Sequence, residues 1–412
     1  MKNILSISIA ICLSACSGGG SAPAGAGGKS DQFTVNSLGG ELDVLRNDGQ
    51  LPDDYTIVIT EASTWDPALT EGLELHAAQK ISYTPLWYAQ NEARWNGGDW
   101  TPWFGLSIND QGAVLDEFSY EVYGPEGALY GPVSVRVEVS PHLYVKGLDA
   151  GADDNNAGTY EEPLATLTRA LELAEYGSVI MIEGNMELSE ATGERLPFVI
   201  KDGVYVFTWR AIASGAGEYF SQTMQEVVTT CFVLKGERTG ISGLYVHGRM
   251  RQEEQERPRV GVLLEGGSPT VAYTDVAEFE FGVLGRALDG AIFERIAVGR
   301  CRNGVDVRES LGTNTMRYSM LSLNDKFGLV LGAPNDINLG TESTPGRNHF
   351  DENYVGLVLT GGGGVQNAYG NYWNEFPLAA FDVDSDELDG PFDVFEDQLG
   401  VIDTRGGDVS GW

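Results

Sequence analysis

The most regular pattern along this chain is a short apolar phrase that begins with glycine and returns about every 22 residues. Its copies begin at Gly261, Gly282, Gly304, Gly328 and Gly356, with spacings of 21, 22, 24 and 28 residues. A fixed phrase at such a period indicates a solenoid, in which each turn of chain buries its apolar side against the next turn. The unequal spacing predicts loops that bulge at the corners, and we expect such loops at 211–227, 247–259 and 332–348.

A helical period precedes the repeats. Leu167, Ala170, Leu171 and Ala174 form one apolar stripe on a helix, and Thr166 stands where it can cap the first free N–H groups. Residues 179–182 then form an apolar run between glycines, which is typical of a strand buried on both faces. We expect a short amphipathic helix that covers the open end of the coil.

Three segments carry a resemblance to a known family. They read AGTYEEPLATLTRALELA with GSVIMIEGN (157–185), NLGTESTPGRNHFDEN (338–353) and AYGNYW (368–373). In this order they resemble a family of bacterial right-handed parallel β-helices of the pectin-lyase-like type, most of which have no known function. The resemblance implies the fold over 142–375 and no single activity.

The part before the coil, 31–141, has the strand period instead. Val133, Val135, Val137 and Val139 alternate with polar residues, which predicts a half-buried strand. The phrases at 42–51, 81–85 and 116–127 resemble cadherin-like and immunoglobulin-like modules of bacterial surface proteins, which implies a spacer or adhesion unit. The predicted fold class is therefore all-β: an N-terminal β-sandwich followed by a right-handed parallel β-helix with an N-terminal capping helix.

An insertion at 86–115 interrupts the sandwich pattern. It holds half of the eight tryptophans of the chain: Trp87, Trp95, Trp100 and Trp103. Aromatic faces beside polar turns are a common way of stacking on sugar rings, so these residues are candidates for glycan contact. The alternative is that the insertion packs as a small cluster of its own, or against the coil.

The first residues resemble a bacterial lipoprotein signal. An apolar run at 4–13, too short to span a bilayer, ends in Leu13-Ser14-Ala15-Cys16. The resemblance implies removal of residues 1–15 and lipid attachment to Cys16, with 16–30 as a flexible tether. It also implies an outer-membrane lipoprotein, periplasmic or surface-exposed, whose membrane partner is reached through the lipid. The alternative is an ordinary signal peptide.

Two cysteines remain in the coil. Cys231 and Cys301 are about three turns apart, roughly 14 Å at the spacing of adjacent strands. A disulfide needs Cα atoms within about 7 Å. We therefore expect two buried thiols.

The charge of the chain is strongly acidic. Asp and Glu number 60 against 26 Lys and Arg, a net charge of −34, which argues against nucleic acid as a partner. In the tail, Asp382, Asp384, Asp386 and Asp393 occupy positions 1, 3, 5 and 12 of a calcium loop, although Glu387 stands where such a loop has glycine. The alternative is that 376–412 is an acidic cap. No other cofactor is indicated.

Arginines gather between 238 and 317, and Arg300 and Arg302 are candidates for binding an acidic polysaccharide. The alternative is that the arginines pair with local carboxylates. Candidates for catalysis on the coil are Tyr245, His247, Asp275, Asp289 and Asp306 with these arginines, although none lies in a known catalytic motif.

The sequence thus predicts an envelope lipoprotein whose β-helix binds glycan. One alternative is a polysaccharide lyase or glycoside hydrolase that acts on an acidic polysaccharide. The other is a structural spacer or adhesin without a small ligand.

Overall fold

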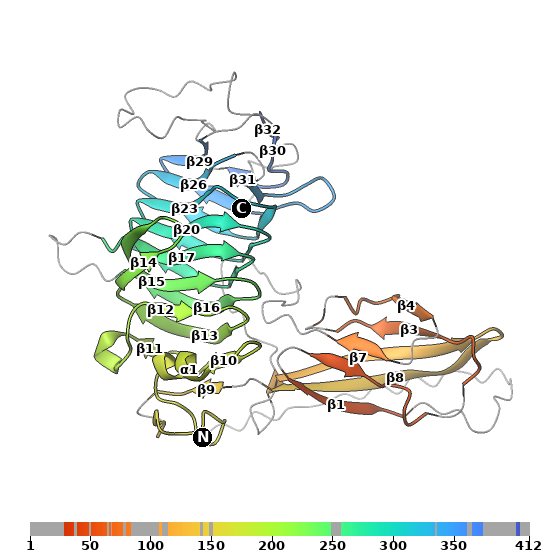
Figure 1. Cartoon of the computed structure of the whole chain (residues 1–412). Coiled ribbons are helices and arrows are strands. Elements are labelled where there is room, and N and C mark those ends of the chain that lie inside the picture. Colours follow the sequence, from red (N-terminus) through yellow and green to blue (C-terminus); the bar gives the residue numbers. More distant parts are fainter. Residues whose placement is uncertain are drawn as a thin grey trace, which may run out of the picture.

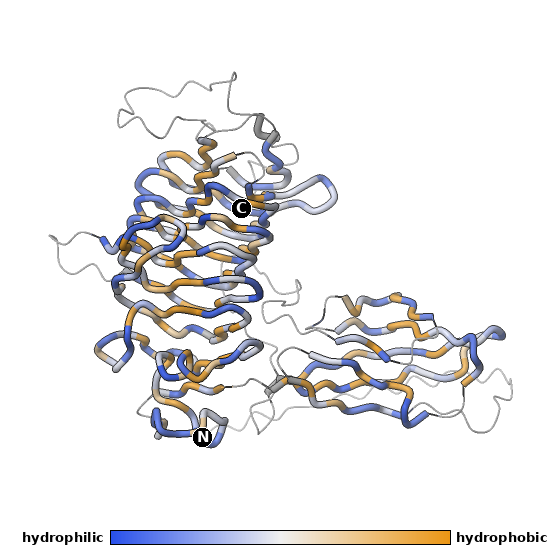
Figure 2. The backbone as a smooth tube through the Cα atoms, in the orientation of Figure 1, coloured by the Kyte–Doolittle hydropathy of each residue, from blue (hydrophilic) through white to orange (hydrophobic). Residues whose placement is uncertain are grey.

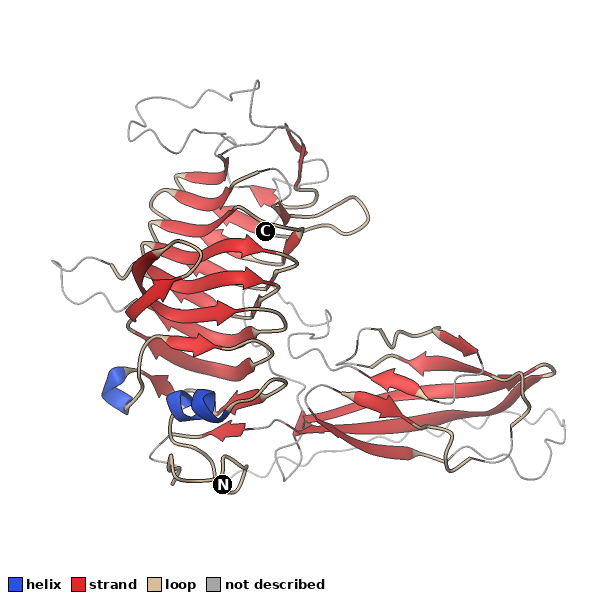
Figure 3. Ribbon diagram, in the orientation of Figure 1, coloured by secondary structure: helices blue, strands red, loops and turns tan. Residues whose placement is uncertain are grey.

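The computed structural model consists of a β-sandwich followed by a right-handed parallel β-helix (Figure 1). It describes residues 29–36, 39–48, 51–63, 66, 68–76, 80–83, 107–108, 114–140, 143–147, 151–248, 257–333, 336–360, 365–373 and 401–403. Strands dominate these residues, with helix confined to α1 (Leu167–Leu173) and a 3₁₀ turn at Glu190–Thr192 (Figure 3). Within the described ranges, neither helical segment has the length and apolar character needed to span a bilayer. The predicted all-β class is confirmed.

The sandwich has one larger sheet, ordered β1-β8-β7-β3-β4 with β6 beside β7, and a smaller sheet of β2 and β5. Its strands are β1 (Asp31–Asn36), β2 (Gly40–Leu42), β3 (Thr56–Glu61), β4 (Glu74–His76), β5 (Ile81–Tyr83), β6 (Ser107–Ile108), β7 (Val114–Gly124) and β8 (Gly127–Ser140). The alternating valines of β8 are buried, as their period predicted. Tyr83 and Tyr120 are also fully buried, and their hydroxyls donate to Asp116 and to the carbonyl of Val44.

The coil has three sides, each built from strands that pair in parallel with the turn above and the turn below. The first side contains β9 (Leu143–Val145), β10 (Val179–Ile182), β18 (Thr270–Ala272), β21 (Ile292–Glu294), β24 (Asn314–Arg317) and β27 (Ile337–Asn338). The second contains β11 (Glu187–Leu188), β19 (Asp275–Ala277), β22 (Ala297–Gly299), β25 (Met320–Ser322), β28 (His349–Asp351) and β31 (Tyr372–Trp373). Two long strands, β13 (Tyr205–Ser214) and β16 (Gly240–His247), bend from the first side to the second.

The third side holds the repeated glycine phrase. Its strands are β12 (Phe198–Ile200), β15 (Glu226–Lys235), β17 (Val260–Gly267), β20 (Phe281–Leu288), β23 (Asn303–Arg308), β26 (Phe327–Leu331) and β29 (Val355–Leu359). Beyond the last turn, β30 (Val365–Asn367) pairs with β32 (Val401–Asp403). Every second residue of a strand points into the coil, and apolar stretches recur in successive turns of the tube in Figure 2.

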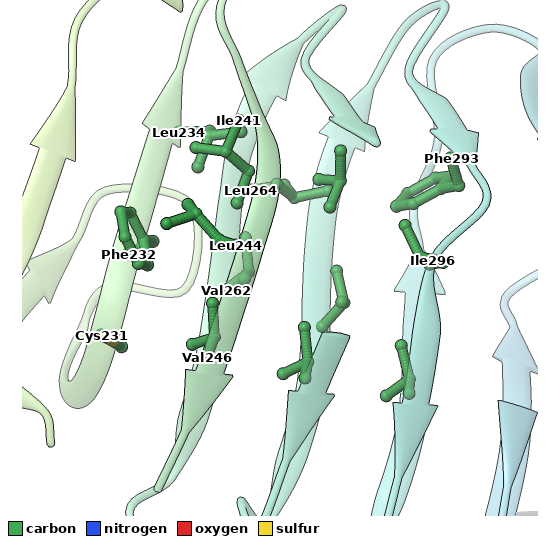
Figure 4. Packing of buried hydrophobic residues seen from close by; sticks show 14 of the residues in the cluster. Cys231, Phe232, Leu234, Ile241, Leu244, Val246, Val262, Leu264, Phe293 and Ile296 are labelled. Atoms are coloured by element: carbon green, nitrogen blue, oxygen red, sulfur yellow. The ribbon is translucent and has the colours of Figure 1, made fainter. Parts of the chain in front are cut away.

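The interior is a continuous apolar column. Phe232, Leu234, Ile241, Leu244 and their neighbours from adjacent turns point toward one another and are fully buried (Figure 4). At the N-terminal end, α1 covers the column with Leu167, Ala170 and Leu171, which confirms the predicted capping helix. Carboxylates bind the backbone N–H groups where α1 begins: Asp154 accepts from Thr166, and Glu194 accepts from Leu167 and Thr168.

The glycine phrase has a steric cause. At Gly304, an added Cβ would lie 2.4 Å from the carbonyl oxygen of Gly328 in the next turn and 2.9 Å from Nδ2 of Asn324. Gly261, Gly282 and Gly328 have equally close neighbours. Each of these glycines lies where the third side begins. There the backbone of the next turn passes directly over the glycine, so a side chain does not fit.

Polar side chains line two inner corners at the upper end of the coil. Asn324 Nδ2 donates to Asn353 Oδ1 at 2.8 Å, and Asn348 Nδ2 donates to Asn371 Oδ1 at 2.9 Å. Each amide also bonds a backbone group of a neighbouring turn: Cys301 N donates to Asn324, for example. These buried amides are therefore hydrogen-bonded along the stacking direction, which fixes the register of successive turns.

A β-hairpin covers part of the third side. The sequence predicts a loop at 211–227, and this prediction is wrong. The segment begins with the end of β13 and continues into β14 (Gly217–Ser221), which pairs antiparallel with β15. The hairpin packs over the outward residues Val233, Leu263 and Leu284, all of which are buried.

A carboxylate fastens the hairpin to the coil. Glu265 of β17 accepts hydrogen bonds from the hydroxyls of Tyr219 and Ser221 at 2.6 Å each, and from the backbone N–H of Gln222 at 2.7 Å. These donors lower the pKa of Glu265 against the opposing effect of its burial, which is the largest single influence on it.

The sandwich meets the first side at its lowest turns. Tyr144, Val179, Met181, Tyr205 and Phe207 point outward from this side, yet they are buried and belong to the same apolar cluster as the core of the sandwich. The sandwich and the coil therefore share apolar contacts.

Cys231 and Cys301 are free thiols buried in the coil. Burial raises the pKa of both, that of Cys301 to about 11. The prediction of two buried thiols is confirmed.

The glycine column leads to a stability prediction. We expect Gly304→Ala to lower the free energy of unfolding by at least about 2 kcal/mol, because its Cβ would overlap backbone that cannot move without breaking the ladder. Gly40→Ala in the sandwich is the control, since its Cβ would meet only Val35 Cγ1 at 3.9 Å. Thermal unfolding followed by circular dichroism measures both, and equal effects would contradict this account of the repeat.

Candidate functional site

The second side of the coil has the candidate site, because its outward residues are partly exposed along most of its length. We call these residues the strip. From the lower to the upper end they are Tyr245, His247, Asp275, Ala277, Ala297, Gly299, Met320, Ser322, His349, Asp351 and Tyr372. Five steps of strand pairing separate Tyr245 from Tyr372, a length of about 24 Å.

The lower end of the strip gathers ionisable and aromatic groups. Tyr245 and Asp275 are direct partners on the neighbouring strands β16 and β19. The rings of Tyr245 and His247 stack with their centroids 6.4 Å apart. Arg210 lies at the corner where β13 bends, with a left-handed φ of 73°, and its guanidinium hydrogen-bonds the hydroxyl of Tyr245.

Burial controls protonation at this end. It raises the pKa of Asp275 to about 6, although the positive charge of Arg210 opposes the shift. Burial also lowers the pKa of His247. The positive charge of Arg300 lowers this pKa further, and the negative charge of Glu278 raises it. Near pH 7 the imidazole is therefore neutral, and a carboxyl group with a pKa near 6 lies beside a protonated tyrosine.

The upper end of the strip repeats this chemistry in part. The rings of His349 and Tyr372 stack with centroids 4.5 Å apart, on the partner strands β28 and β31. Burial lowers the pKa of His349, and the charge of Asp351 opposes this. The middle of the strip has the small side chains of Ala277, Ala297 and Ser322 with Gly299 between them.

A second group lies at the corner between the first and second sides. Tyr273, Arg295, Tyr318 and Arg347 occupy the same position in successive turns, each with a left-handed φ of 46° to 54°. Their side chains alternate in cation–π contacts. The guanidinium carbon of Arg295 lies 5.6 Å from the ring centroid of Tyr273 and 4.8 Å from that of Tyr318, and Arg347 lies 5.5 Å from Tyr318. We call this group the corner stack.

The structure separates the residues that the sequence analysis grouped as catalytic. Tyr245, His247 and Asp275 come together, with Arg300 at the adjoining corner close enough to influence His247. Asp289 lies beyond the third side, where its N–H donates to the carbonyl of Gly267. Arg302 pairs with Glu280 at 3.5 Å.

Asp306 belongs to a closed ion-pair group on the third side. It is 1% exposed and accepts from Arg286 Nη1 at 2.9 Å and from Arg308 Nη2 at 2.7 Å. Its charge is thus compensated by two arginines, so the alternative of local pairing applies to it.

Several predicted site residues lie outside the described residues. They are the glycan-contact candidates Trp87, Trp95, Trp100 and Trp103, the calcium candidates Asp382, Asp384, Asp386 and Asp393, and the lipid site Cys16. Within the described ranges, no group of three or more His, Cys, Asp or Glu side chains is placed to hold a metal ion.

Sequence reasoning missed Arg210, His349 and Tyr372 as members of the site. The signal was present in the register of the repeats: Tyr372 is five turns above Tyr245 on the same column. The glycine phrase aligns successive turns on the third side only. It does not show which outward residues of the second side lie above one another.

Comparisons with known proteins name no activity for this chain. The family described as "Protein of unknown function (DUF1565)" matches residues 150–219, which contain the capping helix and the first turns of the coil. Among solved structures, pectate lyase Pel9A is similar at 13% identity, covering 65% of this chain and 78% of that chain, with a TM-score of 0.32. The native GH136 lacto-N-biosidase from Eubacterium ramulus is similar at 10% identity over 64% of this chain and 68% of that chain, with a TM-score of 0.23. No curated protein matches in sequence.

The protonation of Asp275 leads to a pH prediction. Its folded pKa of about 6 lies above the ordinary value of 3.8, so its favourable contribution to folding is complete below about pH 4 and is lost as the pH rises through 6. We therefore expect Asp275→Asn to be more stable than the wild type at pH 7.5, by about 1 to 3 kcal/mol, and equally stable below pH 4. Chemical denaturation at several pH values measures the difference. A variant less stable than the wild type at pH 7.5 would show that the charged form of Asp275 is the favoured one.

Proposed function

We propose that this protein is an envelope lipoprotein that binds glycan chains along the strip. The observation that carries the proposal is the uneven cover of the coil. The hairpin hides part of the third side and the cluster shared with the sandwich hides the lowest turns of the first, whereas the strip is partly exposed from Tyr245 to Tyr372.

The side chains of the strip suit sugars. Tyr245 and Tyr372 offer aromatic faces near its two ends, on which the apolar C–H face of a sugar ring can stack. His247 is neutral near pH 7, so it can donate and accept hydrogen bonds with hydroxyl groups. His349 is neutral as well, and its Nε2 is buried. Between them, Ala277, Ala297, Gly299 and Ser322 leave room beside Met320 for a chain to lie close to the backbone.

The proposal includes the parts of the chain outside the described residues. Trp87, Trp95, Trp100 and Trp103 would add contacts to the same glycan from the sandwich insertion. Lipid on Cys16 would hold the protein at the outer membrane, with the sandwich as spacer. Binding of glycan rather than nucleic acid accords with the net charge of −34.

Removal of the two end tyrosines tests the strip. We expect the double variant Tyr245→Ala, Tyr372→Ala to lose binding at least about tenfold on a glycan array, because each lost stacking contact is worth about 1 kcal/mol. Tyr176→Ala is the matched control, since Tyr176 is 59% exposed and lies outside the strip, next to α1 at the N-terminal end of the coil. An array on which the wild type and the double variant bind equally would exclude the strip.

One observation favours catalysis as a second candidate function. Asp275, largely protonated below pH 6, and neutral His247 flank Tyr245 on one exposed face. On a 4-linked uronate, His247 would take the C5 proton while the C4–O bond breaks and the C4–C5 double bond forms, and Asp275 would give its proton to the leaving oxygen. Arg210 would neutralise the sugar carboxylate.

Ultraviolet absorbance of the unsaturated product tests this reaction. With uronate polymers as substrates, we expect His247→Gln to reduce the rate by at least about a hundredfold, and Asp275→Asn to reduce it and to remove its decline above pH 6. Asp289→Asn, on the opposite part of the coil, should leave the rate unchanged. A wild-type protein that is silent over the panel, with and without calcium, has no lyase activity.

A further inference from the structure

We infer that the corner stack and its neighbour Arg317 bind the anionic groups of an acidic glycan, carboxylate or sulfate, while the rest of the chain lies on the strip. The inference rests on the proposed function and names the class of glycan. Arg295, Arg317 and Arg347 are the three arginines concerned, and all lie at or beside the edge of the strip formed by Tyr273 and Tyr318.

Stacking holds these guanidinium groups in fixed planes. Arg295 lies between two tyrosine rings and Arg347 lies over the ring of Tyr318. A guanidinium whose faces are covered by aromatic rings still has its N–H donors around its rim. Held in this way, it loses little conformational freedom when it binds a planar carboxylate or a sulfate through two parallel hydrogen bonds.

The arginines of this corner have unused donors. The Nε atoms of Arg295 and Arg317 are buried and have no hydrogen-bond acceptor in the described part of the chain. Arg295 pairs with Glu294 at 3.5 Å and hydrogen-bonds the hydroxyl of Tyr273. Among the described residues, Arg317 and Arg347 form no ion pair. In a chain with 60 acidic residues and 26 basic ones, two neighbouring arginines without an ion pair among the described residues leave a site for an outside anion.

Other arginines of the coil show the contrast. Arg286 and Arg308 are paired with Asp306, Arg259 with Glu226, and Arg257 with Asp325. The alternative of local pairing, raised for the whole arginine-rich region, therefore holds on the third side and at its edges. At the corner it holds for Arg295, which pairs with Glu294, whereas Arg317 and Arg347 have no ion pair among the described residues.

The spacing suits a polymer. Successive turns are about 4.8 Å apart along the coil, and the cationic groups recur along the same direction as the strip. A chain with an anionic group on each sugar, lying along the strip, would present these groups to the corner in sequence. The net charge of −34 opposes a polyanion at long range, but at physiological salt this repulsion is screened beyond about 8 Å, so local contacts decide the outcome.

The test compares charged glycans with their uncharged counterparts. The probes are an oligouronate beside its carboxyl-reduced form, and a sulfated oligosaccharide beside its desulfated form, with binding measured by calorimetry at physiological salt. For the double variant Arg317→Gln, Arg347→Gln, we expect the affinity for whichever acidic probe binds the wild type to fall at least about tenfold, and the affinity for its neutral counterpart to change less than about twofold. The acidic probe that binds identifies carboxylate or sulfate as the group recognised.

Two further variants separate the effect of charge from that of folding. Arg317→Lys with Arg347→Lys keeps the charges and should recover part of the affinity. Arg195→Gln removes an exposed arginine paired with Glu172 and should change the affinity for neither probe. The inference is overturned if the double glutamine variant binds the acidic probe as the wild type does, or if the wild type prefers the neutral forms. A wild type that binds none of the probes overturns the proposed function and the inference with it.

Discussion

Contact between the backbones of successive turns is the constraint on which this structure depends. Where the third side begins, Gly304 and Gly328 approach so closely that a methyl group on the first would overlap the carbonyl oxygen of the second. The same corner places the amides of Asn324 and Asn353 in a hydrogen-bonded row inside the coil. Sterics and hydrogen bonding thus specify one register, and each turn is stable only because its neighbours occupy theirs.

Because the register is fixed, residues that are far apart in the sequence lie next to each other on neighbouring strands. Tyr245 and Asp275 are thirty residues apart and face each other across one pair of strands, and His349 and Tyr372 do the same higher up. The character of such an outer face therefore depends on which side chain stands at each position of each column. On this coil one column carries aromatic and ionisable groups, and the adjoining corner carries tyrosines alternating with arginines.

The period of the glycine phrase and the helical stripe at 167–174 were sufficient to predict the coil and its capping helix, because both depend on local pattern and burial. They could not predict the hairpin of β14 and β15, since an antiparallel excursion has no counterpart in the repeat and its apolar residues face a surface formed elsewhere. The site was predicted in part. Tyr245, His247 and Asp275 were chosen by residue type, and residue type alone also selected Asp306, whose two arginine partners come from the fold. Arg210 could not be found without knowing where β13 bends.

The contact between the sandwich and the lowest turns has a consequence for how such a protein can change over evolution. Tyr205 and Phe207 fix the bottom of the coil, whereas the strip begins above them and extends toward the opposite end. Gain or loss of one 22-residue unit among the upper turns would lengthen or shorten the strip by about 4.8 Å and leave the contact with the sandwich intact. The length of the strip is thereby independent of that contact, and coils of this kind can differ in reach without any change at their base.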